Sequence, residues 1–253
     1  MRRLVFMLTV LAAGALPAQD GRPADSALTL WYERPSREWV EALPVGNGKL
    51  GAMVFGGTTR ERIQFNESTL WAGEPHDYSH SGAVEVLDSL RRLLFAGKQK
   101  EADALASARA MSLPLTQPSY QNFGNLRLEF AGIDSTHVTG YRRSLDLDRA
   151  VVTTRFTADG VTYTREVFAT HPDGVIVVRL SADRAGRVNV SAVLESAHAG
   201  GQYRAIDGRT LAMTGRVTNG AIRFEARLAV RTEGGGASVA VGDSSATIAA
   251  LLP

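Results

Sequence analysis

The chain has 253 residues, of which 44% are hydrophobic and 21% charged, a composition typical of a folded globular protein with a sizeable core. Its 28 basic and 26 acidic residues give a formal charge of +2, and Arg2 and Arg3 account for that excess. The basic residues form no run that would follow a phosphate backbone, which argues against nucleic-acid binding. The chain has no cysteine, so its stability has to come from burial of apolar surface rather than from disulfides.

The first 18 residues have the layout of a secretory signal peptide. Two arginines precede an apolar run over residues 4–13, which is too short to span a bilayer, and small residues follow. A buried N-terminal helix is the alternative. We expect residues 1–18 to be a signal peptide and residues 19–28 a flexible lead-in, and we expect the protein to be periplasmic or extracellular. No later segment predicts a membrane span.

The stretch over residues 39–71, WVEALPVGNGKLGAMVFGGTTRERIQFNESTLW, is rich in glycine and alternates apolar and polar positions. Before it, residues 28–32 alternate like a short strand, and two prolines bracket a loop around Trp39. The Gly-Asn-Gly turn then leads to a strand over residues 49–55. A second strand is predicted over residues 60–66, because its apolar and polar side chains alternate.

Residues 71–81, WAGEPHDYSHS, are irregular and rich in side chains that form hydrogen bonds. A helix is predicted next, because apolar residues repeat at helical spacing from residue 83 to 94. Gly97 is placed to end that helix, and an alanine-rich second helix is expected over about residues 98–111. Together they predict a two-helix insertion near residues 82–111.

From residue 125 onward the apolar pattern has a period of two, which is typical of strands with one buried face. The Asp159-Gly160 pair between two alternating segments is a strong hairpin signal. Further strands are predicted near residues 125–131, 141–148, 151–157, 161–170, 174–182, 187–195, 209–215, 220–232 and 237–242. Short strands with regular turns favour a mainly β fold, a large antiparallel β-sandwich that carries the two-helix insertion.

No motif for a catalytic nucleophile or a phosphate-binding loop stands out in the sequence. The Gly-Asn-Gly turn lacks the βαβ context of a dinucleotide site. His76, Asp77 and His80 are metal-ligand types, but no further ligand follows at a familiar spacing, and a hydrogen-bonded surface loop is the simpler interpretation. We therefore predict no metal and no cofactor.

Carboxylates offer another interpretation, because glycoside hydrolysis uses two Asp or Glu side chains that face each other across the scissile bond. An indole ring can stack on a sugar, while amides and carboxylates bind the hydroxyls. The residues of these types that lie close together in the sequence are Asn66, Glu67, Trp71, Glu74, His76 and Asp77.

The structural alternative is that Trp71 packs on the core while Asn66 and Glu67 brace the turn. Trp31 and Trp39 have the same two interpretations. A second, weaker cluster of the same kind follows the prolines of the second helix and consists of Tyr120, Gln121 and Asn122.

Several motifs resemble glycoside hydrolase family 95, the exported α-L-fucosidases. They are LWYERPSREWVEALPVGNGKLGAMVFGG, RERIQFNESTLWAGEPHDY, LLFAGKQKEADAL, NFGNLRLEF and YRRSLDLDRAVVTTRFTADGVTYTREVFATHPDGVIVVRL. The resemblance covers residues 30–194 and is weaker from there to residue 253. It implies an N-terminal supersandwich-like β domain, followed in the full-length enzyme by a helical linker, an (α/α)6 barrel and a C-terminal β domain.

The resemblance also implies an inverting hydrolysis of terminal α-L-fucosyl linkages by a Glu acid and an Asn/Asp-assisted water, all in the barrel. No family catalytic residue therefore maps onto this chain. We expect residues 29–253 to be the sandwich domain alone, truncated at its C-terminal end and inactive by itself, with the absent barrel as its packing partner. A rim contact to a fucosylated oligosaccharide or glycan is expected from Asn66, Glu67, Trp71 and His76.

Three alternatives to this interpretation remain. One is a split or frameshifted gene that encodes the barrel just downstream. Another is a stand-alone carbohydrate-binding module, which would use the same polar and aromatic loops. Disaccharide phosphorylases share the sandwich-plus-barrel architecture, and a sandwich alone does not fix the chemistry.

Overall fold

The computed structural model describes residues 28–232, 236–241 and 246–252. The predicted signal peptide and nearly all of the predicted lead-in lie outside these residues and stay predictions. Within the described part, no helix has both the length and the apolar character needed to cross a bilayer.

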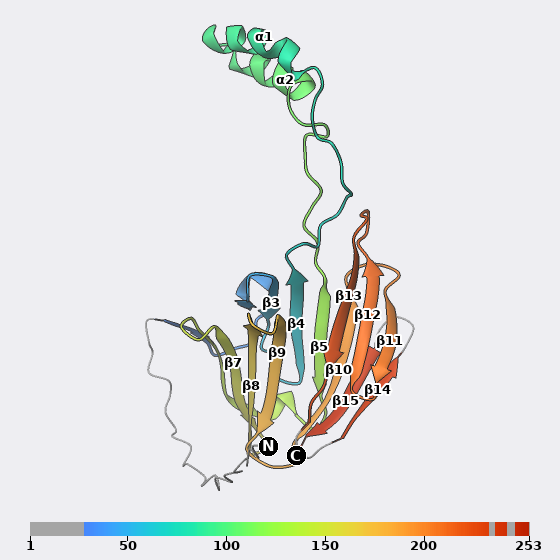
Figure 1. The fold of residues 1–253 in the computed structure, drawn as a ribbon. Coiled ribbons are helices and arrows are strands. Elements are labelled where there is room, and N and C mark those ends of the chain that lie inside the picture. The colour runs from blue at the N-terminus through green and yellow to red at the C-terminus, as the bar shows by residue number, and fades with distance from the viewer. Residues whose placement is uncertain (1–27, 233–235, 242–245, 253) are drawn as a thin grey trace, which may run out of the picture.

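The described residues form a mainly β fold of three antiparallel sheets and two α-helices (Figure 1), which confirms the predicted class. The five-stranded sheet runs in the order β1 (Thr29–Tyr32), β6 (Val138–Asp146), β7 (Val151–Ala158), β8 (Val161–Thr170), β9 (Val175–Ala182). The seven-stranded sheet runs in the order β14 (Gly236–Val241), β15 (Ala246–Leu252), β10 (Val188–Ser196), β5 (Gly124–Phe130), β4 (Arg60–Glu67), β3 (Leu50–Val54), β2 (Leu43–Gly46). The third sheet runs in the order β11 (Gln202–Asp207), β12 (Thr210–Arg216), β13 (Arg223–Ala229).

The core lies on one face of the seven-stranded sheet. On β5 and β10 the buried side chains occupy alternate positions, which all point to the same face. Both smaller sheets cover that face, and their side chains join a single apolar cluster. Representative members are Ile63 and Leu126 from the large sheet, Phe156 from the five-stranded sheet, and Leu211 and Met213 from the third sheet.

Three strands of the described fold, β2, β11 and β15, are absent from the prediction. The sequence predicts a loop around Trp39 that ends at Pro44, but Pro44 lies inside β2, the edge strand of its sheet, where a missing backbone N–H is tolerated. β11 was also missed. The short 3-10 helix η1 (Trp39–Glu41) lies just before β2, and a second one, η2 (Ser135–His137), precedes β6.

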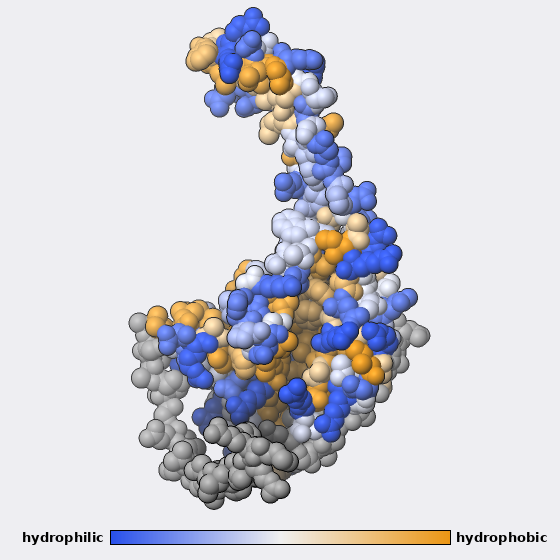
Figure 2. Space-filling model, viewed as in Figure 1, coloured by the Kyte–Doolittle hydropathy of each residue, from blue (hydrophilic) through white to orange (hydrophobic). Residues whose placement is uncertain are grey.

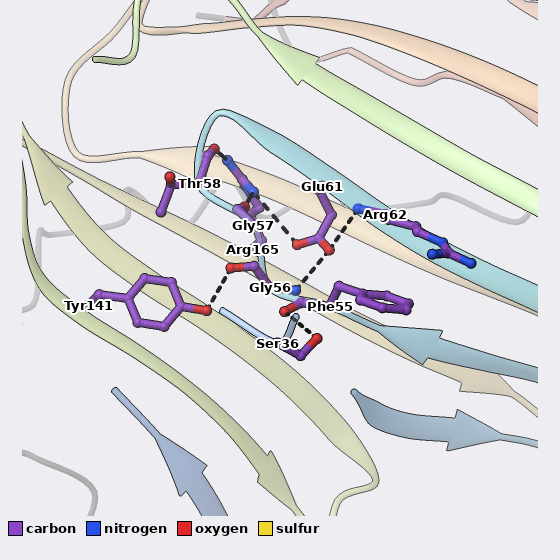
Figure 3. Close-up of polar contacts among 9 residues, drawn as sticks. All are labelled: Ser36, Phe55, Gly56, Gly57, Thr58, Glu61, Arg62, Tyr141 and Arg165. Carbon is purple, nitrogen blue, oxygen red and sulfur yellow. Dashed lines mark hydrogen bonds and ion pairs between the residues drawn. The ribbon is translucent and has the colours of Figure 1, made fainter. Parts of the chain in front are cut away.

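A buried polar cluster joins the two larger sheets (Figure 3). Glu61 on β4 accepts hydrogen bonds from the backbone N–H of Gly56 and of Arg62, at 2.8 and 3.0 Å. Arg165 on β8 lies 3.7 Å from the Glu61 carboxylate and donates to the carbonyls of Gly57 and Thr58. Both charged side chains are at most 3% exposed. The cluster therefore fixes the β3–β4 turn against the opposite sheet.

The two-helix insertion lies between β4 and β5, which are neighbours in the sheet. Its helices are α1 (Ala83–Phe95) and α2 (Gln99–Arg109), as predicted, and Gly97 follows α1 with a φ of +71°. Figure 1 shows both helices held well clear of the sheets by two extended segments. We call residues 74–82 and 110–117 the stalk, and the stalk with its helices the arm.

Candidate functional site

The predicted sugar-binding residues lie at the end of β4 and along the base of the arm. Asn66 is half-buried, and its Oδ1 accepts a 2.7 Å hydrogen bond from the backbone N–H of Phe123, just before β5. That bond ties the ends of two neighbouring strands together. The structure thus places Asn66 in a bracing position.

Glu67, Trp71 and Tyr120 come together at the point where the arm leaves the sandwich. The rings of Trp71 and Tyr120 lie 5.4 Å apart at 60°, and both residues are about two-fifths exposed. Their polar ends are already bonded, since the Trp71 indole donates to Ser68 O at 3.1 Å and the Tyr120 hydroxyl donates to Glu67 O at 3.0 Å. The exposed part of the two rings is therefore what this pair can offer a ligand.

The carboxylate of Glu67 is only partly engaged. Its Oε2 accepts from the backbone N–H and the hydroxyl of Thr69, at 2.8 and 2.6 Å. Its Oε1 is buried and finds no partner among the described residues. Partial burial, and after it the Glu67 charge, raise the pKa of Tyr120, so that hydroxyl stays protonated and acts as a donor.

His76 lies farther out, on the stalk. Its Nε2 is 2.9 Å from Leu113 O on the opposite stalk segment, and its ring packs edge-on against Tyr78 at 4.9 Å. Asp77 accepts from the backbone and hydroxyl of Ser79, and these bonds lower its pKa. In the described part of the chain, no group of three His, Asp or Glu side chains is arranged to hold a metal ion.

A pocket of about 600 Å³ opens between the base of the stalk and the turn that joins β12 to β13. Gly73 anchors the stalk to this turn, since its N–H donates to Asn219 O at 2.9 Å and its carbonyl accepts from Ala221 N at 2.8 Å. The pocket is lined by Gly73, Glu74, Ala199, Arg216, Val217, Thr218, Asn219 and Gly220. A carboxylate, a guanidinium, an amide and backbone groups thus surround one opening, a set that suits a neutral polyhydroxylated ligand.

The sequence interpretation missed the β12–β13 side of this pocket. His198, which is 6% exposed, holds the pocket residue Thr218 in place. The Nδ1 atom of His198 accepts a hydrogen bond from Thr218 N at 3.1 Å, so the proton is on Nε2. That Nε2 is buried without a hydrogen-bond partner in the described structure. The Asn219-Gly220 pair was the available signal, because Asn-Gly is typical of tight turns, and Asn219 indeed has a φ of +56°.

A carboxyl group with a pKa near neutrality is a usual sign of a general acid, but here it lies in the wrong place. Burial raises the pKa of Glu61 to about 7, against the opposing effect of the Arg165 charge. Glu61 is 3% exposed between two sheets, so no substrate reaches it. We therefore assign Glu61 a structural role. The polar and aromatic groups at the base of the arm remain the candidate binding site.

Gly73 offers a test of how firmly the stalk base is fixed. Its φ is +84°, and a Cβ there would come within 2.5 Å of the Pro118 ring. We expect Gly73→Ala to lower the free energy of unfolding by about 2 kcal/mol, from backbone strain together with the clash. Urea unfolding of the variant and the unmodified protein measures this loss of stability.

The matched control is Gly132→Ala, at a φ of +79° with nothing within 4 Å of the added Cβ. It carries the strain without the clash and is expected to cost about 1 kcal/mol. Equal losses in the two variants would show that the packing of Gly73 on Pro118 contributes nothing.

Comparison with known proteins gives a match over almost the whole described chain. Residues 30–250 match the family model described as "Glycosyl hydrolase family 65, N-terminal domain". The chain is 38% identical over 183 residues to alpha-L-fucosidase 2 of Arabidopsis thaliana, a segment that covers 70% of the chain. It is 32% identical over 171 residues, 64% of the chain, to the probable alpha-fucosidase A of Aspergillus niger, and 29% identical over 168 residues, 62% of the chain, to that of Aspergillus oryzae.

The aligned segments account for 21%, 21% and 22% of those three relatives, respectively. The chain thus spans about a fifth of the length of the curated relatives that it matches.

Proposed function

Because the chain belongs to the family of glycosyl hydrolase family 65 N-terminal domains, we propose that it is the N-terminal domain of a longer, α-L-fucosidase-like glycoside hydrolase. The longer enzyme hydrolyses terminal α-L-fucosyl linkages of a fucosylated oligosaccharide or glycan. This chain supplies the sandwich and the arm, and the catalytic residues lie elsewhere. Membership of glycoside hydrolase family 95, to which the motifs point, is part of the proposal.

The observation that carries the proposal is the similarity, at 38% identity over most of the chain, to a protein named as an α-L-fucosidase. The arm base adds a physical argument. The exposed rings of Trp71 and Tyr120 and the polar pocket beside Gly73 lie at the base of the arm, and both support a contact to a sugar. The predicted rim of Asn66, Glu67, Trp71 and His76 is retained in this proposal.

The test compares the 253-residue chain with the longer enzyme encoded by its continuous reading frame. We expect the longer enzyme to release the aryl group from an aryl α-L-fucoside and the chain alone to give no turnover. Turnover by the chain alone would contradict the assignment of the catalytic residues to another domain. A longer enzyme that requires phosphate and accepts glucosides instead would favour a disaccharide phosphorylase.

A second candidate function, a stand-alone carbohydrate-binding module, is favoured by the partly exposed rings of Trp71 and Tyr120. It predicts saturable binding of fucosylated oligosaccharides by the chain alone, which titration calorimetry measures. Trp71→Ala is then expected to weaken binding by about tenfold or more, because the stacking face is lost. The control is Trp39→Ala on η1, which is 55% exposed and remote in sequence from the pocket lining. Absence of binding would leave the N-terminal-domain function as the sole proposal.

We also infer export to the periplasm or the cell exterior, on the strength of the N-terminal residues MRRLVFMLTVLAAGALPA. N-terminal sequencing of the protein recovered from the producing cells tests this inference. A mature start close to residue 19 is expected, and an intact Met1 would contradict it.

A further inference from the structure

The helix α1 presents a wide apolar surface, and α2 covers only part of it. Val86, Leu90 and Leu93 are half-buried and share a side of α1 at spacings of four and three residues. They face α2, whose Ala102 is 3% exposed and is the one buried residue of the two helices. This contact forms the seam of the helical hairpin.

A second apolar row lies beside the seam and stays exposed. Val84 is 83% exposed and Phe95 is 91% exposed, values close to those of a fully solvated side chain. Leu87 and Leu94 belong to the same row, at 42% and 56%. At 100° per residue these four positions fall within about a quarter of the helix circumference. Arg91 lies in the same arc and is bonded to Asp88 at 3.3 Å. We call Val84, Leu87, Leu94 and Phe95 the open face of α1.

A hairpin of this size is not expected to persist alone in water. Its helices have 13 and 11 residues, and isolated helices of that length are marginal without tertiary contacts. No residue of α1 is buried, and Figure 1 shows the helices standing away from the sheets. A surface helix normally gains its stability by burying its apolar stripe, so the open face requires a cover.

The exposed apolar surface continues down the stalk toward the sandwich. Met111, Leu113 and Leu115 are between 49% and 61% exposed. Figure 2 shows apolar residues on the surface of the arm. Residues 83–109 carry four acidic and five basic side chains, so their charge favours neither a nucleic acid nor a strongly charged lipid surface. An apolar protein surface that extends along the arm would cover these residues.

We propose that the open face of α1 docks on the remaining part of the longer enzyme, the polypeptide that the relatives possess beyond the segment matched here. This inference rests on the proposed function and deepens it by naming the surface that receives the catalytic part. The matched residues 30–250 include the arm, and the aligned segment is 21% of the α-L-fucosidase of Arabidopsis thaliana. About four-fifths of such a protein is thus available as the cover, tethered in the same chain at high effective concentration.

The absence of cysteine provides a clean experiment. A cysteine introduced at Val84 on the open face is the one thiol in this chain, and its reaction with a maleimide reports exposure. The matched control is Ser107→Cys, which is exposed on the side of α2 that faces away from the seam. Both variants are made in the 253-residue chain and in the longer enzyme, and hydrogen exchange of residues 83–109 in the unmodified proteins serves as the second measurement.

Docking predicts that Val84→Cys reacts about tenfold or more slowly in the longer enzyme than in the chain alone, while Ser107→Cys reacts at one rate in both. Hydrogen exchange over residues 83–109 slows in the same comparison. Equal Val84→Cys rates, with equal exchange, in a longer enzyme that hydrolyses the fucoside would overturn the docking proposal and leave the proposed function intact. Protection in the chain alone, with a dimer in light scattering, would identify a second copy as the cover and overturn it too. A longer enzyme without fucosidase activity but with protection would support docking and sink the proposed function.

Discussion

Replacing Arg165 with alanine is expected to lower the free energy of unfolding by about 3–5 kcal/mol, the usual cost of removing one partner of a buried ion pair. The loss has two sources. At pH 8, above its pKa of about 7, the Glu61 carboxyl 3.7 Å away is ionised and is left without its counter-charge. The carbonyls of Gly57 and Thr58 lose the donors that hold the β3–β4 turn to the opposite sheet. Urea unfolding followed by far-UV circular dichroism measures the change.

The matched control is Arg179→Ala on the neighbouring strand β9. Arg179 also faces a carboxylate, that of Glu166 at 3.5 Å, but its side chain is 74% exposed. An exposed pair of this kind contributes about 0–1 kcal/mol. A loss below about 1 kcal/mol for Arg165→Ala would show that the buried cluster is replaceable by simple apolar packing.

The stability of the protein is expected to fall between about pH 4.5 and pH 7 because of Glu61. Burial raises the pKa of this carboxyl from 4.5 to about 7 in the folded protein. In that range the unfolded chain has already released the proton, while the folded protein retains it. Unfolding then releases a proton, so the free energy of unfolding decreases as pH rises, by about 3 kcal/mol at most. Arg165 stays charged throughout, since burial lowers its pKa only to about 10.

The comparison that isolates this effect uses Glu61→Gln, because glutamine keeps an acceptor for the N–H groups of Gly56 and Arg62 but does not titrate. Urea unfolding of both proteins from pH 4.5 to pH 8 gives a difference curve. The unmodified protein should lose stability relative to the variant as pH rises. A flat or opposite difference would mean that Glu61 is ionised in the folded state even near pH 4.5. Carboxyls with lowered pKa values, such as Asp77 and Asp134, act in the opposite direction and cancel in the difference.

The elements that the sequence predicts best are those fixed by local chemistry. The β7–β8 hairpin forms where Asp159-Gly160 was expected to turn, and both residues have positive φ values, +50° and +70°. The helices follow from their apolar period, and Gly97 ends the first. β2 was missed because proline is tolerated in a strand only at a sheet edge, and the order of strands in a sheet cannot be inferred from local sequence.

The buried ion pair had a signal that could have been used. Glu61 has the same parity as Ile63 on β4, and Arg165 has the same parity as Tyr163 and Val167 on β8. Opposite charges on the inward sides of two strands are expected to pair, since burying a charge without a partner is too costly. What the sequence does not contain is the pairing itself, because 104 positions separate the two residues.

The candidate site shows the same limit. Trp71 and Tyr120 belong to two separate clusters in the sequence. They meet because β4 and β5 pair in the sheet, although the whole arm lies between them in the chain. The register of that strand pair, rather than any motif, brings the rings together. The β12–β13 side of the pocket could not be predicted from the sequence either, since it depends on how the third sheet lies beside the stalk.

The insertion of the arm between two paired strands gives the chain a natural split point. β4 and β5 share six aligned residue pairs, and the Trp71–Tyr120 bridge closes the ladder at the arm base. A protease that cuts between residues 74 and 117 therefore severs the backbone without opening the sheet. The two pieces should migrate as one particle in a native gel and separate only on denaturation. We therefore expect the sandwich to assemble from two complementing fragments, and to fold with its arm exchanged for a short turn, because the pairing of β4 with β5 does not require that segment to be continuous.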